Sequence, residues 1–369
     1  MKVIHILHEL KFSGAEIMYV DAAPLFQQKG CKLIVLATAP ELGEYAPYFE
    51  QAGYKVLHQP YPPLKNYLKR LKYYWNFSRF LKSEKIDVVH IHSHKCMWGM
   101  ALAARIAKRR SVYTFHNVFF SRNIIYIYRC LLRWSAKKIF KCKFQTISDS
   151  VYEHELKFYH NPTAKIYNWY GSNRFFPALD GEKEKVRQEL NIPPKTLVLI
   201  SIGGCSTIKR HSEIIKALSL IISKTPNCIY LHLGKGISEC EEQKLSLELG
   251  LKEHIRFAGN QKNVRKYLIA SDIYLMTSIY EGISITTIEA MACNIPAILY
   301  NVPGLRDFNK TKECSILIEE DFTRLAESII YLYKNKEKQK ELISNAKQLV
   351  DSTFNMEINA SKIFELYHQ

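Results

Sequence analysis

The sequence predicts an α/β protein of two domains, each built on a parallel β-sheet. Its 369 residues exceed what one hydrophobic core usually serves. Short apolar runs that suit buried strands alternate with helix-like segments along the whole chain. The 47% hydrophobic and 24% charged content is that of a soluble globular protein. No apolar run reaches the ~20 residues that a membrane-spanning helix needs.

The first half of the chain opens with the alternation expected of a β–α–β unit. An apolar segment at residues 2–8 leads to a loop with Ser13 and Gly14, then to a helix ending near Gly30 and a second apolar segment at 32–37. The first segment is too short and too polar for a signal peptide, so we expect it to be a strand. Further strands are expected at 86–92, 111–115 and 143–147.

The second half repeats this alternation after a polar stretch at residues 181–188. Strands are expected at 196–202, 228–233, 254–258, 272–276 and 296–300, and closing helices near 321–334, 337–352 and 355–367. We therefore expect a first domain at residues 1–175, a second at 176–354 and a C-terminal helix at 355–369.

The net charge of +17 is concentrated in two segments of the first half. Residues 61–85 carry seven Lys/Arg and one Glu, and residues 122–143 carry seven Lys/Arg and no acid. The first segment also holds seven aromatic residues. Basic residues interleaved with aromatic ones are typical of a helix that lies on an anionic membrane surface.

The predicted membrane-facing residues follow helical spacing in both segments. In the first, the apolar positions are Leu64, Tyr67, Leu68, Leu71, Tyr74 and Trp75, and the basic ones are Lys65, Lys69, Arg70 and Lys72. In the second, the expected positions are Arg129, Arg133 and Trp134. Two other interpretations stay open: solvated helices whose aromatic sides join the core, and a surface that stacks bases. No nucleic-acid-binding motif is present, so we expect no nucleic-acid partner.

One stretch near the C-terminal end combines a strand, a glycine turn and a helix start. The apolar run 273–276 precedes a loop with Gly282, and a helix is expected at 283–293, stopped by Asn294 and Pro296. Such a junction offers an anion the free backbone N–H groups at the positive end of the helix dipole.

The donors at this junction would be the amides of Ile283, Ser284 and Ile285. Glu281 precedes the helix and Glu289 lies eight residues on, about 12 Å along a helix. Two carboxylates beside an anion site suit a ligand with a phosphate centre and hydroxyl-rich ends, such as a nucleotide sugar. The plainer alternative is an amphipathic helix with an acidic first turn.

These residues also carry a resemblance to a known family. Glu281-Gly282, the run Glu289-Ala290-Met291-Ala292 and the later Pro296 resemble the donor-binding signature of GT4-type retaining glycosyltransferases, also called glycosyltransferase group 1. Other matches are Gly14, Glu16, His116, Asn168, Phe176, Pro177 and Lys209. Two positions depart from the family pattern: Gly204 stands where an Arg is expected, and Arg210 stands where a Gly is expected.

The resemblance implies a GT-B fold, in which two Rossmann-like domains with parallel sheets face a central cleft and the last helix returns to the first domain. It implies a retaining transferase whose catalytic residues are Glu281, His116 and Lys209. On this view Glu281 holds the hydroxyls of the donor sugar, and Glu289 binds the ribose. The remaining donor-binding residues would be Gly14, Lys209, Arg210, Gly282, Ile283, Ser284 and Ile285.

No Asp-x-Asp motif is present, so we expect no metal and no other cofactor. The charge of the leaving diphosphate would then be met by Lys209, Arg210 and helix amides. The donor is expected to be a UDP- or GDP-sugar. The acceptor is expected to be a lipid-linked glycan of cell-surface polysaccharide or lipopolysaccharide synthesis, at the cytoplasmic face of the membrane. Two rivals remain: a nucleotide-sugar epimerase of the same fold, and a non-catalytic glycan- or nucleic-acid-binding protein.

The spacing of the histidines and cysteines does not predict a metal site. His90, His92 and His94 alternate and could share one face of a strand, but we expect them to line the end of the sheet. The nine cysteines are scattered, odd in number and never in C-x2-C spacing, which predicts reduced thiols.

Overall fold

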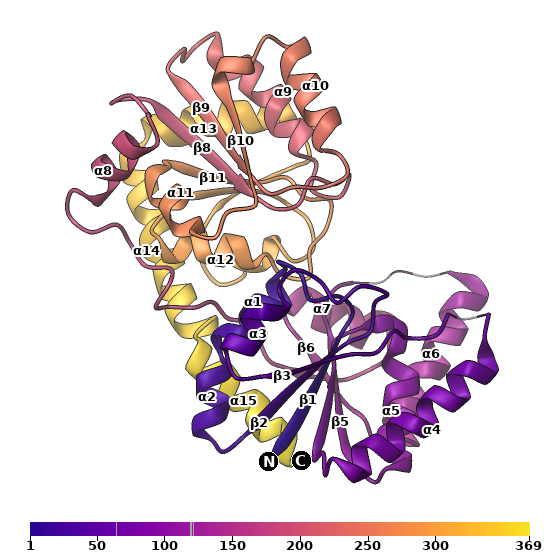
Figure 1. The fold of residues 1–369 in the computed structure, drawn as a ribbon. Coiled ribbons are helices and arrows are strands. Elements are labelled where there is room, and N and C mark those ends of the chain that lie inside the picture. The colour runs from indigo at the N-terminus through magenta and orange to yellow at the C-terminus, as the bar shows by residue number, and fades with distance from the viewer. Residues whose placement is uncertain (64, 119, 121) are drawn as a thin grey trace. The chain divides into compact units, whose positions relative to one another are not determined.

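The computed structural model describes residues 1–63, 65–118, 120 and 122–369, and Leu64 of the first basic segment lies outside them. The chain divides into two compact units (Figure 1). The first comprises Met1–Trp169 and Met356–Gln369, and the second comprises Tyr170–Asn355. The division therefore falls close to the predicted boundary at residue 175, and the C-terminal helix belongs to the first unit.

The first unit contains one parallel sheet of seven strands in the order β3-β2-β1-β4-β5-β6-β7. Its strands are β1 (Lys2–Leu7), β2 (Lys32–Ala37), β3 (Lys55–His58), β4 (Val88–Ile91), β5 (Arg110–Phe115), β6 (Lys143–Thr146) and β7 (Ala164–Lys165). The sequence did not predict β3 and β7. Both lie at sheet edges and are only partly buried, so neither has the continuous apolar run of a central strand.

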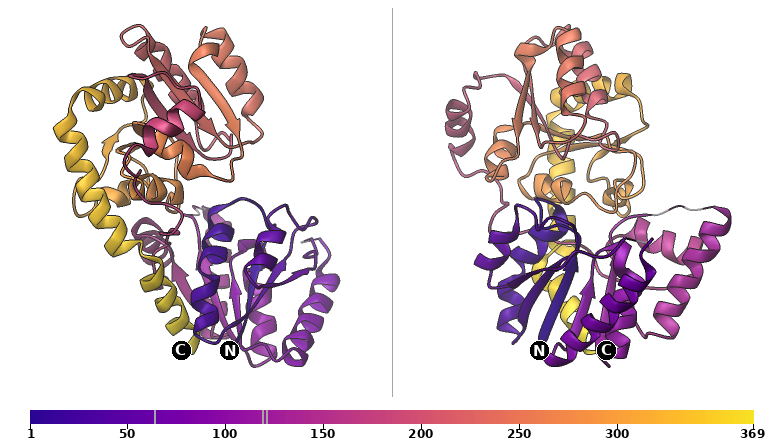
Figure 2. Two further views of the ribbon diagram at one scale, coloured as in Figure 1. Left: turned by 60° about the vertical axis from the view of Figure 1, so that its left-hand side comes forward. Right: turned by 45° about the vertical axis from the view of Figure 1, so that its right-hand side comes forward.

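Helices cover both faces of this sheet (Figure 2). They are α1 (Gly14–Asp21), α2 (Ala23–Gln28), α3 (Ala46–Gln51), α4 (Tyr67–Ser83), α5 (Met97–Ile106), α6 (Asn123–Lys138), α7 (Asp149–Glu153) and α15 (Met356–His368), with short helical turns at His94–Cys96 and His154–Phe158. Helices α4 and α6 both pack on α5, and α15 packs on α2 and β5. The single helix expected before Gly30 is two helices, because Pro24 in the first turn of α2 cannot continue the α1 hydrogen-bond ladder.

The second unit contains one parallel sheet of six strands in the order β10-β9-β8-β11-β12-β13. Its strands are β8 (Leu197–Ile202), β9 (Cys228–Leu233), β10 (Ile255–Gly259), β11 (Ile273–Met276), β12 (Ala297–Tyr300) and β13 (Ile316–Ile318). Its helices are α8 (Glu182–Glu189), α9 (His211–Ile222), α10 (Glu239–Glu248), α11 (Val264–Ala270), α12 (Ile285–Ala292), α13 (Phe322–Lys334) and α14 (Lys336–Thr353), with short turns at Lys252–His254 and Arg306–Asn309.

The polar stretch at 181–188, for which the sequence predicted no helix, forms α8. Its attachment is electrostatic: both terminal nitrogens of Arg265 donate to the carboxylate of Glu182, at 2.6 and 2.7 Å. Because Val186 is the one buried residue of this helix, its apolar pattern was too weak to predict it.

Both sheets reverse their strand order beside their first strand. In the first unit the chain moves outward from β1 to β3 and then returns to place β4 on the other side of β1. In the second unit β8 and β11 are neighbours for the same reason. Ligands of open α/β sheets bind at such switch points, beyond the carboxyl ends of the strands. We therefore expect the loops after β8 and β11 to carry a ligand site.

Candidate donor site

The loops after β8 and β11 are held together by backbone contacts at the switch point. The N–H of Ile279 donates to the carbonyl of Ile208 at 2.9 Å. The hydroxyl of Thr277 donates to the carbonyls of Lys209 and Arg210, at 2.9 and 3.0 Å. This pairing fixes the position of the basic residues that follow β8 relative to the acidic loop that follows β11.

Lys209 and Glu281 meet at this junction, although 72 residues separate them in the sequence. The ammonium of Lys209 lies 2.6 Å from Oε1 of Glu281, and the hydroxyl of Ser278 donates to the same oxygen at 2.6 Å. The Lys209 and Glu281 side chains are 24% and 14% exposed. The pair is thus accessible to a ligand but largely shielded from water, where charges interact strongly. The structure brings together two of the three predicted catalytic residues.

Helix α12 begins beside Glu281, two residues later than the sequence predicted. Ser284 is the N-cap residue, and its hydroxyl accepts from the N–H of Thr287 at 3.2 Å. The first-turn amides of Ile285 and Thr286 have no acceptor within the helix, so the helix offers them to an anion. Glu289, the predicted ribose ligand, lies on the same helix and is buried.

Arg210, at the position where the family pattern has a glycine, has a left-handed backbone conformation. Its φ of 51° and ψ of 43° lie in the left-handed region, which costs a non-glycine residue roughly 1–2 kcal/mol. Its guanidinium pairs with Glu320 and lies 3.6 Å from Glu213. Two carboxylates therefore oppose its charge, and its expected role on a diphosphate stays a prediction.

Lys235 is a candidate residue that the sequence analysis missed. It follows β9, and its carbonyl lies so close to Gly204 that a Cβ there would be 3.1 Å away. Its side chain runs over Gly259, where a Cβ would lie 2.8 Å from its Cε. Within the part of the chain that the structure describes, no hydrogen bond or ion pair engages its ammonium. Its position between two glycines, Gly234 and Gly236, at the carboxyl end of a predicted strand was the available signal.

The switch point of the first unit carries an acidic residue, Glu16, in the first turn of α1. Gly14 starts α1, and the hydroxyl of its N-cap residue Ser13 donates to the carboxylate of Glu16. Glu16 is 6% exposed, and burial raises the pKa of its carboxyl to about 7. This carboxyl changes charge near neutral pH.

His116 follows β5 and ends a chain of three histidines. Nε2 of His116 lies 3.1 Å from Nδ1 of His92, and Nε2 of His92 lies 3.1 Å from Nδ1 of His5. Burial lowers the pKa of His116 to about 4 and that of His92 well below its ordinary value, so these rings are neutral. Each neutral ring carries one proton, which leaves two possible directions for the hydrogen bonds.

The direction of these hydrogen bonds follows from the two histidines at the ends of the series, His5 and His116. Nε2 of His5 is buried without a partner among the described residues, and a buried N–H without an acceptor is costly. The favoured arrangement therefore has His5 donating to His92 and His92 donating to His116. His116 then carries its proton on Nδ1, which no described residue engages. His92 is thus a positioning residue that the sequence analysis did not assign.

The other two alternating histidines have different partners. Nδ1 of His90 lies 2.6 Å from the hydroxyl of Tyr367, and its Nε2 lies 2.7 Å from the hydroxyl of Thr114. His94 starts a short helical turn and contacts the hydroxyl of Tyr113 at 3.1 Å. Both ring nitrogens of His90 are engaged, so the three histidines do not form a common ligand set.

One of the residues predicted to face a membrane is buried instead. Arg133 was expected to face a membrane, but its side chain is 3% exposed. Its Nε and a terminal nitrogen each donate to Glu155 at 2.8 Å, and its guanidinium stacks on Tyr159. A buried guanidinium needs such a partner, which the sequence pattern could not reveal. Tyr74, also expected on the apolar side of the first basic helix, is buried as well.

The other expected membrane-facing residues lie at or near the surface. Lys65, Lys69, Lys72, Trp75 and Trp134 are exposed, whereas Arg70 and Arg129 are partly buried. Nε of Arg70 donates to the carbonyl of Pro62 at 3.0 Å. No helix of the described residues has the length and apolar character needed to span a bilayer.

Comparisons with known proteins agree with this architecture. Residues 12–203 match Glycosyltransferase Family 4, and residues 182–349 match the family described as glycosyl transferases group 1. An N-acetyl-alpha-D-glucosaminyl L-malate synthase of Bacillus anthracis is 26% identical over 58% of this chain, which spans about half (56%) of that relative's length. A UDP-Gal:alpha-D-GlcNAc-diphosphoundecaprenol alpha-1,3-galactosyltransferase of Escherichia coli is 24% identical over 81% of this chain and 80% of its own length.

Solved structures show the same likeness of fold. Anabaena HepE in complex with UDP superposes with a TM-score of 0.84 at 20% identity, covering 99% of both chains. Two parallel-sheet domains and neighbours such as HepE show the GT-B fold. The two family matches identify a glycosyltransferase. The chain belongs to glycosyltransferase family 4.

Proposed function

We propose that this glycosyltransferase transfers a sugar from a nucleotide-sugar donor to a hydroxyl of a lipid-linked glycan, with retention at the anomeric carbon and without a metal. The observation that carries the proposal is the Lys209–Glu281 pair beside the start of α12, at the switch point of the second sheet. A cation, a carboxylate and free amides at one point match the charge and hydroxyl pattern of a nucleoside diphosphate sugar.

The donor is a UDP-sugar in this proposal, with a GDP-sugar as the next candidate. HepE, similar in fold, was solved with UDP and with UDP-glucose, and the E. coli relative is named for UDP-Gal. The diphosphate would contact Lys209, Lys235 and the first amides of α12. Arg210 would add its charge only if it left Glu213 and Glu320.

The chemistry follows from how the charges are placed. As the bond from the sugar to the diphosphate breaks, negative charge grows on the leaving oxygen, and preorganised donors stabilise it more than they stabilise the bound donor. The leaving phosphate takes the proton of the acceptor hydroxyl. In this proposal Glu281 is not the base, and its Oε1 accepts from Lys209 and Ser278. It orients the sugar hydroxyls, and the expected role of His116 toward the sugar stays a prediction.

The acceptor side is proposed to lie against an anionic membrane. Helix α4 exposes Tyr67, Leu68, Leu71 and Trp75, and α6 exposes Ile124, Ile127, Tyr128, Leu131 and Trp134. On α6 the pattern is inverted, because the apolar stripe faces outward while Arg133 faces inward. Both helices pack on α5, so the two stripes belong to the same layer of the first unit (Figure 1). Exposed apolar stripes beside exposed lysines suit an interface with lipid headgroups at the cytoplasmic face.

Donor specificity and reaction class are tested together. A thermal-shift panel of UDP-, GDP-, ADP- and CMP-sugars should show stabilisation by one nucleotide class. Incubation with that donor alone, followed by product analysis, separates a transferase from an epimerase: the epimerase converts the donor sugar without an acceptor. Stabilisation by oligonucleotides and by no sugar nucleotide would contradict the proposal.

Membrane attachment is tested by sedimentation with vesicles containing phosphatidylglycerol. The double variant Lys69→Glu/Lys72→Glu and the single variant Trp134→Ser should bind less, since each site is exposed. Lys334→Glu/Lys340→Glu makes the same charge change on exposed residues of the second unit and serves as the control. If the control loses as much vesicle binding as the α4 variant, the effect is one of net charge alone. If all variants bind vesicles as the native chain does, the proposal that α4 and α6 contact a membrane is refuted.

A further inference from the structure

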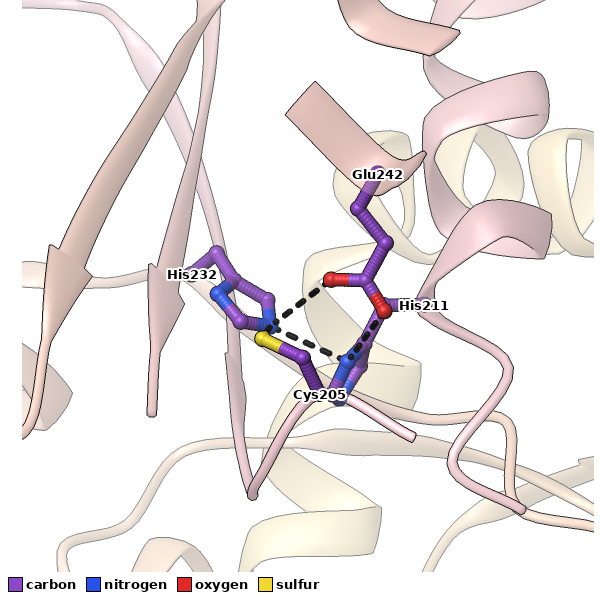
Figure 3. A group of neighbouring side chains, drawn as sticks. All are labelled: Cys205, His211, His232 and Glu242. Atoms are coloured by element: carbon purple, nitrogen blue, oxygen red, sulfur yellow. Dashed lines mark hydrogen bonds and ion pairs between the residues drawn. The ribbon is translucent and has the colours of Figure 1, made fainter. Parts of the chain in front are cut away.

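A buried cluster of four metal-ligand side chains lies behind the loop that carries Lys209. Cys205 comes from the loop after β8, His211 is the first residue of α9, His232 lies in β9, and Glu242 lies in α10 (Figure 3). Each offers one ligand atom, and these atoms all lie within 4.8 Å of one another. All four residues are buried.

The spacing of the ligand atoms matches a tetrahedral zinc site. Nε2 of His232 lies 3.0 Å from Nδ1 of His211, 3.6 Å from Oε2 of Glu242 and 3.8 Å from Sγ of Cys205. Nδ1 of His211 lies 3.3 Å from Oε1 of Glu242. Zinc with ordinary bond lengths and tetrahedral angles separates its nitrogen and oxygen ligands by about 3.3 Å and places sulfur about 3.6 Å from nitrogen.

The protein's own hydrogen bonds leave the cluster incompletely satisfied. Three atoms of the cluster are buried and have no hydrogen-bond partner among the described residues: Oε2 of Glu242, Nε2 of His211 and Nδ1 of His232. The thiol of Cys205 makes long contacts with the ring of His232 and with the carbonyl of Gly234, both at 3.8 Å. A buried carboxylate oxygen without a donor is costly, and a cation at the centre would satisfy it.

We propose that Cys205, His211, His232 and Glu242 bind one structural Zn²⁺ ion. A thiolate, a carboxylate and two neutral imidazoles balance the charge of the ion, which makes the whole site neutral and inexpensive to bury. The mixture of sulfur, nitrogen and oxygen ligands suits zinc, whereas calcium and magnesium prefer oxygen alone. With four protein ligands the site has no open position, so the ion takes no part in sugar transfer.

A zinc ion at this site would affect the loop between β8 and α9, which carries Lys209. Cys205 and His211 stand on either side of Lys209 and Arg210 in the sequence. The ion would therefore tie both ends of this loop to β9 and α10. The close approach of the chain here leaves no room for a side chain at Gly236, where a Cβ would collide with the backbone of Cys205. Zinc would hold the Lys209 loop in the position that pairs it with Glu281.

The first test measures the metal in protein purified without a histidine tag and without chelator. Elemental analysis should find close to one zinc per chain. Cys205→Ser and His232→Ala should lose it, whereas Cys240→Ser, an exposed cysteine on the same helix as Glu242, should keep it. A chain that lacks zinc and neither binds added Zn²⁺ stoichiometrically nor gains thermal stability from it overturns the proposal.

A second test on the native chain does not depend on how the variants fold. Cobalt exchanged for zinc should give visible bands of tetrahedral intensity and a near-ultraviolet charge-transfer band from the Cys205 thiolate. The native spectrum lacking the thiolate band contradicts the proposed ligands. So does a folded Cys205→Ser variant, verified by circular dichroism, that retains one zinc per chain.

Discussion

Replacing Glu281 with Gln should separate donor binding from sugar transfer. Gln keeps the size of the side chain and an oxygen that can accept from Lys209 and Ser278, but it removes the negative charge. In the native chain this charge lies 2.6 Å from the Lys209 ammonium and offsets it. The variant therefore leaves Lys209 with more attraction for a diphosphate, while it weakens the hydrogen bonds from the sugar hydroxyls.

The two effects have opposite signs and different sizes. Hydrogen bonds to a charged group contribute about 1.5–3 kcal/mol, so their weakening should lower kcat/KM by roughly 10- to 150-fold. The repulsion between a partly shielded carboxylate and the diphosphate contributes on the order of 1 kcal/mol, so UDP alone should bind about fivefold more tightly. Binding and catalysis should thus move in opposite directions.

Isothermal titration with UDP and initial rates with the donor identified by thermal shift measure the two quantities. Glu337→Gln is the control, because it removes an exposed carboxylate on α14 that pairs with Lys340. The reasoning is refuted if Glu281→Gln weakens UDP binding and transfer by the same factor. It is also refuted if transfer stays within threefold of the native rate.

Three further predictions concern single charged residues. Lys209→Met should lower kcat by about 10²–10³ through loss of a leaving-group contact, whereas Arg210→Met, whose charge two carboxylates already oppose, should cost less than about tenfold. Because burial raises the pKa of Glu16 to about 7, its stabilising protonated form is fully present below the ordinary pKa of 4.5 and is lost as the pH rises through 7. At pH 8 the free energy of unfolding of Glu16→Gln should therefore exceed that of the native chain by about 3 kcal/mol, and at pH 4 the two should match. Arg133→Met should lower the free energy of unfolding by about 3–5 kcal/mol, since it leaves a buried carboxylate unpaired, and Arg129→Met by less than about 1 kcal/mol.

Each of these has a definite contrary outcome. Equal rate losses for the variants of Lys209 and Arg210 would mean that both cations contact the diphosphate. If the free energy of unfolding of Glu16→Gln and that of the native chain change in parallel between pH 4 and 8, the pKa of Glu16 is not raised into this range. Denaturant unfolding that gives Arg133→Met and Arg129→Met the same stability would contradict the buried ion pair.

The sequence was sufficient for the architecture. Continuous apolar runs mark the central strands of parallel sheets because both faces of those strands are covered. The strands at 2–8, 196–202 and 272–276 were predicted close to the observed β1, β8 and β11 for this reason. The edge strand β3 and the polar helix α8 lack such a pattern and were missed.

The site was only partly predictable. Glu281 was identified from the strand, glycine turn and helix start around it, whereas Lys209 was identified by resemblance to a family. No local pattern connects residues so far apart. Their contact exists because the strand order makes β8 and β11 neighbours. Lys235 was missed for the same reason, because its relevance depends on which loops end beside it.

The sequence by itself determined the class of fold, the family and the uneven distribution of charge. Periodicity shows which residues share one side of a helix, but it does not show which side packs inward. The tertiary structure alone decided that Arg133 is buried while Trp134 is exposed, that His92 stands behind His116, and that four distant side chains converge around Cys205. These outcomes depend on strand order and on helix packing, which bring together residues that no local pattern connects.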